Sequence, residues 1–133
     1  MITGNCLCKG IRFEIDGTLA PIQMCHCKEC REAQGTAFVT NIPVTASKFR
    51  LVAGKELLKS YESSPGKQRV FCGTCGSPVL SQRDSQPDVV RVRAGLINED
   101  IDARPAFHIF VGDKANWWEI CDQLPQYQEW PKE

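Results

Sequence analysis

The sequence predicts a mainly-β protein. Many short runs rich in β-forming residues are separated by turn-forming ones, and very little 3.6-residue periodicity is present. The 10 Gly and 8 Pro in 133 residues support frequent turns and short strands rather than long helices. This length corresponds to one domain with a single modest core, and we expect residues 1–133 to form it.

The first predicted strand covers residues 10–16. Apolar and charged side chains alternate along it, which puts the apolar ones on a single face and is typical of a half-buried strand. Its apolar residues are Ile11, Phe13 and Ile15. Asp16-Gly17 then provides a turn signal, so we expect the strand to end there.

A short helix is predicted for residues 28–34, where polar residues suit it and Gly35 follows as a stop signal. Residues 21–24 lead into the cysteine-rich stretch that precedes this helix. Nearer the N-terminus, Cys6 and Cys8 would point to the same side of an extended segment. This cysteine pair and the cysteine-rich stretch before the helix are the candidate metal ligands considered below.

The remaining strands are predicted from β-forming residues that lie between turn signals. They cover residues 36–44, 49–52, 57–61, 68–72, 79–81, 89–94 and 107–111. Two valines alternate with arginines in the segment 89–94. A turn is expected at residues 63–66, residues 98–106 are expected to be irregular, and the tail that follows is aromatic.

Composition and charge exclude several classes of function. The chain is 42% hydrophobic and 24% charged, as is usual for globular proteins. Its 16 basic and 16 acidic residues cancel, so no bulk field would steer it to nucleic acid or to an anionic membrane. A run of about 18 apolar residues, which a membrane span needs, is missing, as is a signal-peptide pattern. We therefore expect a cytoplasmic location, with neither nucleic acid nor membrane as a partner.

In a reducing compartment, eight cysteines are expected to be metal ligands rather than disulfides. Cys72-x-x-Cys75-Gly is typical of half a zinc site, because two thiolates on a tight turn point the same way. A closed site needs four ligands, and Cys6 and Cys8 are the pair available without breaking up the central triplet. We predict a structural zinc ion held by Cys6, Cys8, Cys72 and Cys75.

Three further cysteines, Cys25, Cys27 and Cys30, lie within six residues. A disulfide framework would always leave one of them over and would strain the nearest pairs. Three thiolates can instead converge on one zinc ion and leave its fourth tetrahedral position open, as catalytic zinc sites do. We predict that Cys25, Cys27 and Cys30 are the ligands of a second zinc ion and the catalytic residues of the protein. Because one coordination position of this ion would be open, we expect the ion to be lost easily.

An alternative is a second closed structural site, in which Cys121, His26 or His108 supplies the fourth ligand. Geometry makes His26 awkward for the ion of its neighbours, and a structural or supporting role is expected for it. His108 is expected to be a satisfied core histidine, and Cys121 a small buried hydrophobe. Core packing is expected for Trp117 and Trp118.

The cysteine motifs together resemble those of the glutathione-dependent formaldehyde-activating enzyme family, which includes centromere protein V-like domains. In order, they are Cys-x-Cys, Cys-His-Cys-x-x-Cys-Arg and Phe-Cys-x-x-Cys-Gly-Ser. The resemblance runs from about Gly4 to about Pro125. Supporting marks include Gly35-Thr36-Ala37-Phe38, Arg93-Ala94-Gly95-Leu96 and the C-terminal Asp122-x-Leu-Pro.

This resemblance implies a β-rich, Mss4-like fold of short antiparallel strands around two zinc sites, with one or two short helices. It implies that Cys6, Cys8, Cys72 and Cys75 hold the structural zinc, and that Cys25, Cys27 and Cys30 hold the catalytic one. The implied activity is condensation of formaldehyde with glutathione to S-hydroxymethylglutathione, which is classed in the reverse direction as that of a carbon–sulfur lyase.

The triplet suits this chemistry. Three thiolates make zinc a poor Lewis acid but a good binding partner for a fourth thiolate. The sequence thus leads to the hypothesis that a small glutathione-like thiol binds there and adds reversibly to an aldehyde such as formaldehyde. Lys28 and Arg31 could hold glutathione carboxylates, although solvated charges on a short helix explain them equally well.

Two other classes of function are compatible with the motifs. A non-enzymatic zinc-binding interaction module predicts an exposed apolar patch and no small-molecule pocket beside the triplet. A thiol or metal sensor predicts that mild oxidant expels the metal from the triplet and forms a disulfide there, while the quartet keeps its metal.

Overall fold

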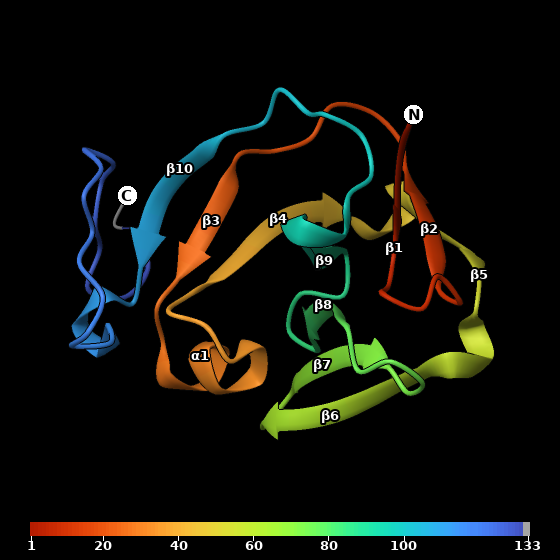
Figure 1. Ribbon diagram of the computed structural model, residues 1–133, viewed down its shortest axis with the longest axis horizontal. Coiled ribbons are helices and arrows are strands. Elements are labelled where there is room, and N and C mark those ends of the chain that lie inside the picture. The colour runs from red at the N-terminus through yellow and green to blue at the C-terminus, as the bar shows by residue number, and fades with distance from the viewer. Residues whose placement is uncertain (132–133) are drawn as a thin grey trace.

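The fold is mainly β, as predicted (Figure 1). The computed structural model describes residues 1–131, so the last two residues of the predicted domain lie outside the described ones. The described part contains two β-sheets and one α-helix. Three short 3-10 turns lie between strands: η1 (Ala46–Lys48), η2 (Lys55–Leu57) and η3 (Ala94–Leu96). A fourth, η4 (Val111–Asp113), follows the last strand of the described residues.

The smaller sheet is antiparallel, with the strand order β1-β2-β5. Its strands are β1 (Ile2–Asn5), β2 (Arg12–Ile15) and β5 (Phe49–Ala53). The alternation predicted for β2 is present, because Phe13 and Ile15 are buried while Arg12 is exposed. Phe13 also stacks on Phe49 of β5, with ring centroids 5.1 Å apart.

The larger sheet has the order β10-β3-β4-β9-β8-β7-β6 and curves across the whole molecule (Figure 1). All its neighbouring strands are antiparallel except β10 and β3, which are parallel. Its strands are β3 (Ile22–Cys25), β4 (Val39–Thr45), β6 (Leu58–Ser64), β7 (Lys67–Cys72), β8 (Pro78–Arg83), β9 (Val89–Arg93) and β10 (Pro105–Ile109).

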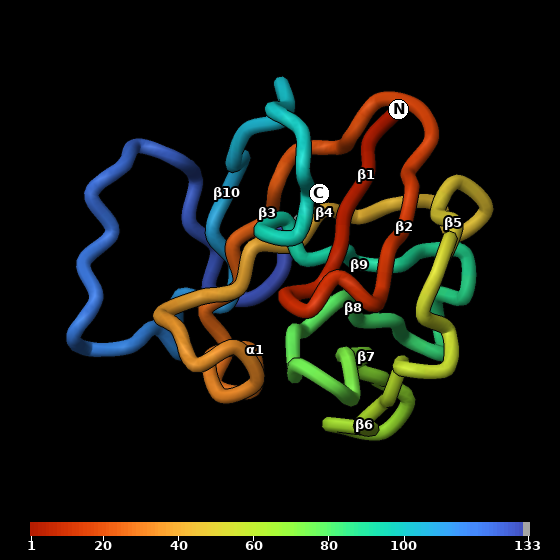
Figure 2. Tube along the Cα trace, turned by 45° about the vertical axis from the view of Figure 1, so that its right-hand side comes forward, coloured from red at the N-terminus to blue at the C-terminus, as the bar shows by residue number. Residues whose placement is uncertain are grey.

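The two faces of the larger sheet differ in chemistry, because successive side chains of a strand point to opposite sides. On β9, Val90 and Val92 join a buried core to which Phe13 of the smaller sheet also contributes. In the view of Figure 2, the strands β1 and β2 of the smaller sheet pass in front of β9. Arg91 and Arg93 alternate with these valines and therefore face the other way. The sheet consequently has an apolar face toward the core and a polar face toward the cysteine triplet.

The single α-helix, α1 (Lys28–Gln34), has the predicted bounds. Its N-cap is Cys27, whose sulfur accepts a hydrogen bond from the backbone N–H of Cys30. It ends at Gly35, whose left-handed backbone (φ 68°) lets its N–H donate to the carbonyl of Arg31 at 2.7 Å. Within residues 1–131, no helix has the length and apolar character needed to cross a membrane.

Two strands, β1 and β3, lie where no strand was predicted. Neither has the alternation of apolar and charged residues that marks β2, and both are strands because neighbouring strands pair with them. The prediction that residues 98–106 are irregular is wrong at its end, because β10 already starts at Pro105. Its parallel pairing with β3 joins segments that are distant in sequence, so no local signal marks it.

Cys6 and Cys8 lie in a turn and not in an extended segment. The backbone N–H of Cys6 donates to the carbonyl of Ile11, and that of Lys9 donates back to the carbonyl of Cys6. Lys9 itself has a positive φ of 64°. The two sulfurs still lie on the same side, because the turn curls around them.

Candidate metal centres and the adjoining cavity

Four cysteines meet where two hairpins approach each other. Cys6 and Cys8 come from the β1–β2 connection. Cys72 is the last residue of β7, and Cys75 lies in the turn between β7 and β8. Their sulfurs all lie within 4.8 Å of one another, with Cys6 to Cys8 at 3.5 Å and Cys8 to Cys72 at 3.8 Å. A tetrahedral zinc with Zn–S bonds of about 2.3 Å requires sulfur–sulfur distances of about 3.8 Å. The quartet therefore has the donor chemistry and the spacing of a closed site.

Hydrogen bonds reach three sulfurs of this quartet, those of Cys6, Cys72 and Cys75. The N–H of Ile11 donates to the sulfur of Cys6 at 3.3 Å, and that of Thr74 donates to the sulfur of Cys72 at 3.4 Å. Hydrogen bonds from Ser77 lower the pKa of Cys75 to about 5. Because β1 and β2 belong to the smaller sheet and β7 and β8 to the larger one, a metal ion here would cross-link the two sheets.

The cysteine triplet surrounds the start of α1. Cys25 ends β3, Cys27 caps the helix and Cys30 lies in its first turn. The three sulfurs lie within 4.8 Å of one another, and among residues 1–131 no fourth ligand-type side chain belongs to this group. Cys25 and Cys30 are buried, whereas Cys27 is half-buried. The triplet could thus hold a metal ion with three protein ligands.

The electrostatics of the triplet favour shared negative charge. Hydrogen bonds with Cys27 and Cys30 raise the pKa of Cys25. Hydrogen bonds with Cys25 and Cys27, followed by the charges of Lys67 and Arg69, lower the pKa of Cys30. The Arg69 Nη2 atom lies 3.6 Å from the Cys30 sulfur. Such a cluster is suited to a soft divalent cation, which deprotonates its thiol ligands.

Behind the triplet, two buried histidines form a relay with a carboxylate. His26 Nε2 lies 2.8 Å from His108 Nδ1, and His108 Nε2 lies 2.9 Å from Asp122 Oδ2. Burial lowers the pKa of His26 to about 4, so its ring is neutral at pH 7. The expectation that His108 is a satisfied core histidine is confirmed, because it is buried and both its ring nitrogens have a partner. His26 is also buried, but its Nδ1 has no partner among the described residues, and its supporting role stays a prediction. Sequence reasoning did not single out Asp122 for this network, although it lies in the C-terminal motif.

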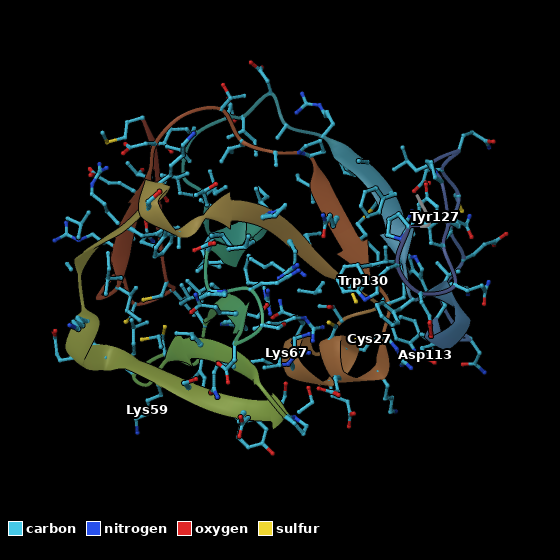
Figure 3. All side chains as sticks on the ribbon, turned by 180° about the vertical axis from the view of Figure 1, so that it is seen from behind. Cys27, Lys59, Lys67, Asp113, Tyr127 and Trp130 are labelled. Atoms are coloured by element: carbon cyan, nitrogen blue, oxygen red, sulfur yellow. The ribbon has the colours of Figure 1, made fainter. Side chains whose placement is uncertain are left out.

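A cavity of about 270 Å³ opens beside the triplet, on the polar face of the larger sheet. Figure 3 shows Cys27, Lys67, Asp113 and Trp130 gathered around it, far from Lys59 on β6. Its charged lining is mostly basic. The basic residues are Lys28, Lys67, Arg69, Arg83 and Arg91, and the acidic ones are Glu29 and Asp113.

Most of these cations escaped the sequence analysis. The only signal was the alternation of arginines with valines in β9, which predicts a basic face but not what that face borders. Of the two residues considered as carboxylate holders, Lys28 does line the cavity. Arg31 instead donates to the backbone carbonyl of Asp113 at 3.0 Å and fastens the C-terminal segment to α1.

The C-terminal segment contradicts three expectations. Trp117 and Trp118 are not core residues, because 66% and 40% of their surfaces are exposed. Cys121 is exposed as well and belongs to neither cysteine group. This segment lies outside the edge strand β10 and is covered on one side only, so its apolar residues cannot all be enclosed (Figure 1).

The fold and the two cysteine groups define a β-rich protein with two candidate metal centres, one closed by four sulfurs and one open at three. The family model described as glutathione-dependent formaldehyde-activating enzyme matches residues 1–113. Because this match covers most of the chain, the protein belongs to that family.

Two curated relatives agree with this assignment. A Halomonas elongata protein, named as a candidate glutathione-dependent formaldehyde-activating enzyme, is 29% identical over 129 residues, which cover 90% of this chain and 81% of the relative. A Schizosaccharomyces pombe protein named as an uncharacterized lyase is 31% identical over 128 residues, which cover 93% of this chain and 88% of the relative. A crystal structure of a Rhodobacter sphaeroides protein shares the fold, with a TM-score of 0.64 and 24% identity over 78% of this chain and 99% of that one.

Proposed function

We propose that this protein is a zinc-dependent carbon–sulfur lyase-type enzyme. In the direction of synthesis it adds a small glutathione-like thiol to an aldehyde such as formaldehyde. The family and the names of its relatives support this class of reaction. The observation that carries the proposal is a three-cysteine group, with no fourth ligand among residues 1–131, that borders a cavity of small-molecule size.

The two cysteine groups have different roles in this proposal. Cys6, Cys8, Cys72 and Cys75 hold a structural zinc that joins the sheets. Cys25, Cys27 and Cys30 hold the catalytic one. Zinc bound at three thiolates would supply a fourth position, at which a thiol loses its proton and becomes nucleophilic.

The reaction is an addition without net oxidation. A sulfur–carbon bond forms, the carbonyl double bond becomes a C–OH single bond, and the thiol proton ends on the former carbonyl oxygen. The reverse direction breaks the sulfur–carbon bond and releases the aldehyde. The triplet fixes where the sulfur lies, and the cavity beside it provides room for the aldehyde carbon.

The structure bears differently on the two rival functions. An interaction module predicts no small-molecule pocket beside the triplet, so the cavity found there argues against it. The sensor hypothesis and the enzyme proposal both require the open triplet, and their responses to an oxidant distinguish them. A sensor forms a reversible disulfide within Cys25, Cys27 and Cys30 under mild oxidant, whereas the enzyme keeps its zinc and turns over thiol and aldehyde.

Zinc content per chain tests the proposal directly. We expect two zinc ions in the wild type, one in Cys27→Ser and two in Cys121→Ser, which changes the exposed cysteine outside both groups and serves as the matched control. Glutathione should bind the wild type and the control but not Cys27→Ser. One zinc ion in all three proteins, with no response to glutathione, would exclude a catalytic zinc at the triplet.

A further inference from the structure

The cavity concentrates positive charge in a protein of zero net charge. Five basic side chains line it against two acidic ones, although the whole chain has 16 of each sign. The strand register explains how they meet. Ser81 of β8 lies opposite Arg69 of β7 on one side and Arg91 of β9 on the other, and Lys67 lies opposite Arg83. These side chains therefore share one face of the larger sheet.

Arg69 has an unused donor inside the protein. It is 8% exposed, its Nε donates to Ser63 at 2.9 Å, and its Nη2 lies against Cys30 and 3.8 Å from Glu29. Its Nη1 is buried without a hydrogen-bond partner among the described residues. A buried guanidinium donor without an acceptor is costly, because nothing replaces the water it lost. The position beside the triplet suggests that a ligand supplies the acceptor.

Arg91 is in the same situation on the neighbouring strand. Its Nη2 donates to Gln86, but Nε and Nη1 are buried without a partner in the described part of the chain. The ring of Trp130 lies 5.8 Å from the Arg91 guanidinium and 5.9 Å from that of Arg83, which holds both in place. Burial also lowers the pKa of Arg91 and of Lys67.

Arg93 shows what a purely structural arginine looks like in this sheet. It is 3% exposed, and its donors reach Asn41, Ser81, Gln34 and a backbone carbonyl. Within the cavity lining, the buried donors without a partner therefore belong to Arg69 and Arg91. Two other buried nitrogens without a partner among the described residues, His26 Nδ1 and Arg31 Nε, belong to residues outside that lining. The thiolates of the triplet also do not supply enough negative charge to pair with the cations of the cavity. Three thiolates with one divalent ion leave a single formal negative charge, which Arg69 already neighbours.

We propose that Arg69 and Arg91, assisted by Lys67, form a carboxylate-binding subsite of this cavity, so that the reacting thiol or aldehyde carries a carboxylate close to its reactive atom. Two guanidinium groups with free donors match the paired oxygens of a carboxylate. Because Arg69 touches the triplet itself, the carboxylate lies within a few bonds of the reacting sulfur or carbonyl carbon. Formaldehyde supplies no such group, whereas compact mercapto acids and 2-oxo acids do.

This inference rests on the proposed function for the placement of the reactive atom, and the probes are chosen to separate the two. Calorimetry on the zinc-loaded protein compares 3-mercaptopropionate with 2-mercaptoethanol, and glyoxylate with acetaldehyde. A carboxylate subsite predicts tighter binding of the acid in at least one pair, by about tenfold to a hundredfold. The pair that shows the difference identifies whether thiol or aldehyde carries the carboxylate.

Arg91→Gln should abolish this preference without weakening the binding of 2-mercaptoethanol. Arg69→Gln should do the same if it folds, and Arg91 provides the independent test if it does not. Arg12→Gln is the matched control, because Arg12 is exposed on the smaller sheet, and it should keep the preference. Equal affinities within both pairs, or a preference that survives Arg91→Gln, would overturn the subsite.

A third arm distinguishes failure of the proposed function. Propionate has the carboxylate but no thiol, and Cys27→Ser lacks one triplet ligand. If both proposals hold, propionate binds more weakly than 3-mercaptopropionate to the wild type, and the two bind equally to Cys27→Ser. If propionate equals 3-mercaptopropionate on the wild type and loses affinity in Arg91→Gln, the subsite stands and thiol binding at the triplet fails.

Discussion

At the scale of single residues, the support behind the triplet depends on His108. Its ring bridges the ring of His26 and the carboxylate of Asp122. The backbone N–H of His26 donates to the carbonyl of Ile109 at 3.0 Å. His26 lies between two of the triplet cysteines in the sequence, so the relay fixes the chain segment that presents them. Both histidine rings also contact Phe38, which closes the space around them.

We expect His108→Ala to lower the free energy of unfolding by about 2–3 kcal/mol, because it leaves a cavity and strips His26 of a buried partner. Asp122→Asn should cost much less, because the carboxylate is 43% exposed and water can replace the lost interaction. Urea denaturation of zinc-loaded protein measures both values. A His108→Ala variant as stable as the wild type would show that the relay does not support the triplet.

The same residues show what a sequence can and cannot predict. The spacing of cysteines predicts two groups, because thiolates close in sequence can converge whatever the fold around them. The partner of His108 cannot be predicted in this way. Asp122 lies beside it because the C-terminal segment runs next to β10, and no local pattern in the sequence indicates that arrangement. Arg69 and Arg91 are equally hidden, because no local pattern tells whether a basic strand face borders water or a cavity.

At the scale of elements, α1 is short and depends on its ends. Its seven residues are too few for an isolated helix, so the caps at Cys27 and Gly35 contribute a large share of its stability. The stop signal at Gly35 was readable in the sequence because a left-handed residue there has a local cause. The pairing of β3 with β10 cannot be predicted from the sequence in this way, because it depends on the fold as a whole.

Gly35→Ala should destabilise the protein by about 1–2 kcal/mol, because an L side chain resists the positive φ even though no atom lies within 4 Å of the added Cβ. Gly95→Ala is the control, since its Cβ also meets nothing but its φ lies outside the left-handed range, and its effect should be close to zero. Thermal unfolding of both variants measures the difference. Equal melting temperatures would contradict a conformational requirement at Gly35.

At the scale of the whole molecule, the two cysteine groups organise different parts of the fold. The quartet joins the hairpins of the two sheets, and the triplet anchors α1 at the mouth of a basic cavity. The mainly-β class, the helix and both cysteine groups were predictable, because each has a local sequence signal. The strand order, the cavity and the exposed C-terminal segment could not be predicted, because they depend on contacts between residues that are distant in the sequence.

Cobalt substitution tests the central claim, an open three-thiolate site that accepts a further thiol. Each thiolate bound to Co²⁺ adds sulfur-to-metal charge-transfer absorption. In protein loaded with Co²⁺ at both sites, we predict that glutathione raises this absorption by one further thiolate per chain, and that Cys27→Ser shows no rise. An unchanged spectrum in the wild type, with both sites loaded, would contradict the account, because the triplet would then have no position open to a thiol.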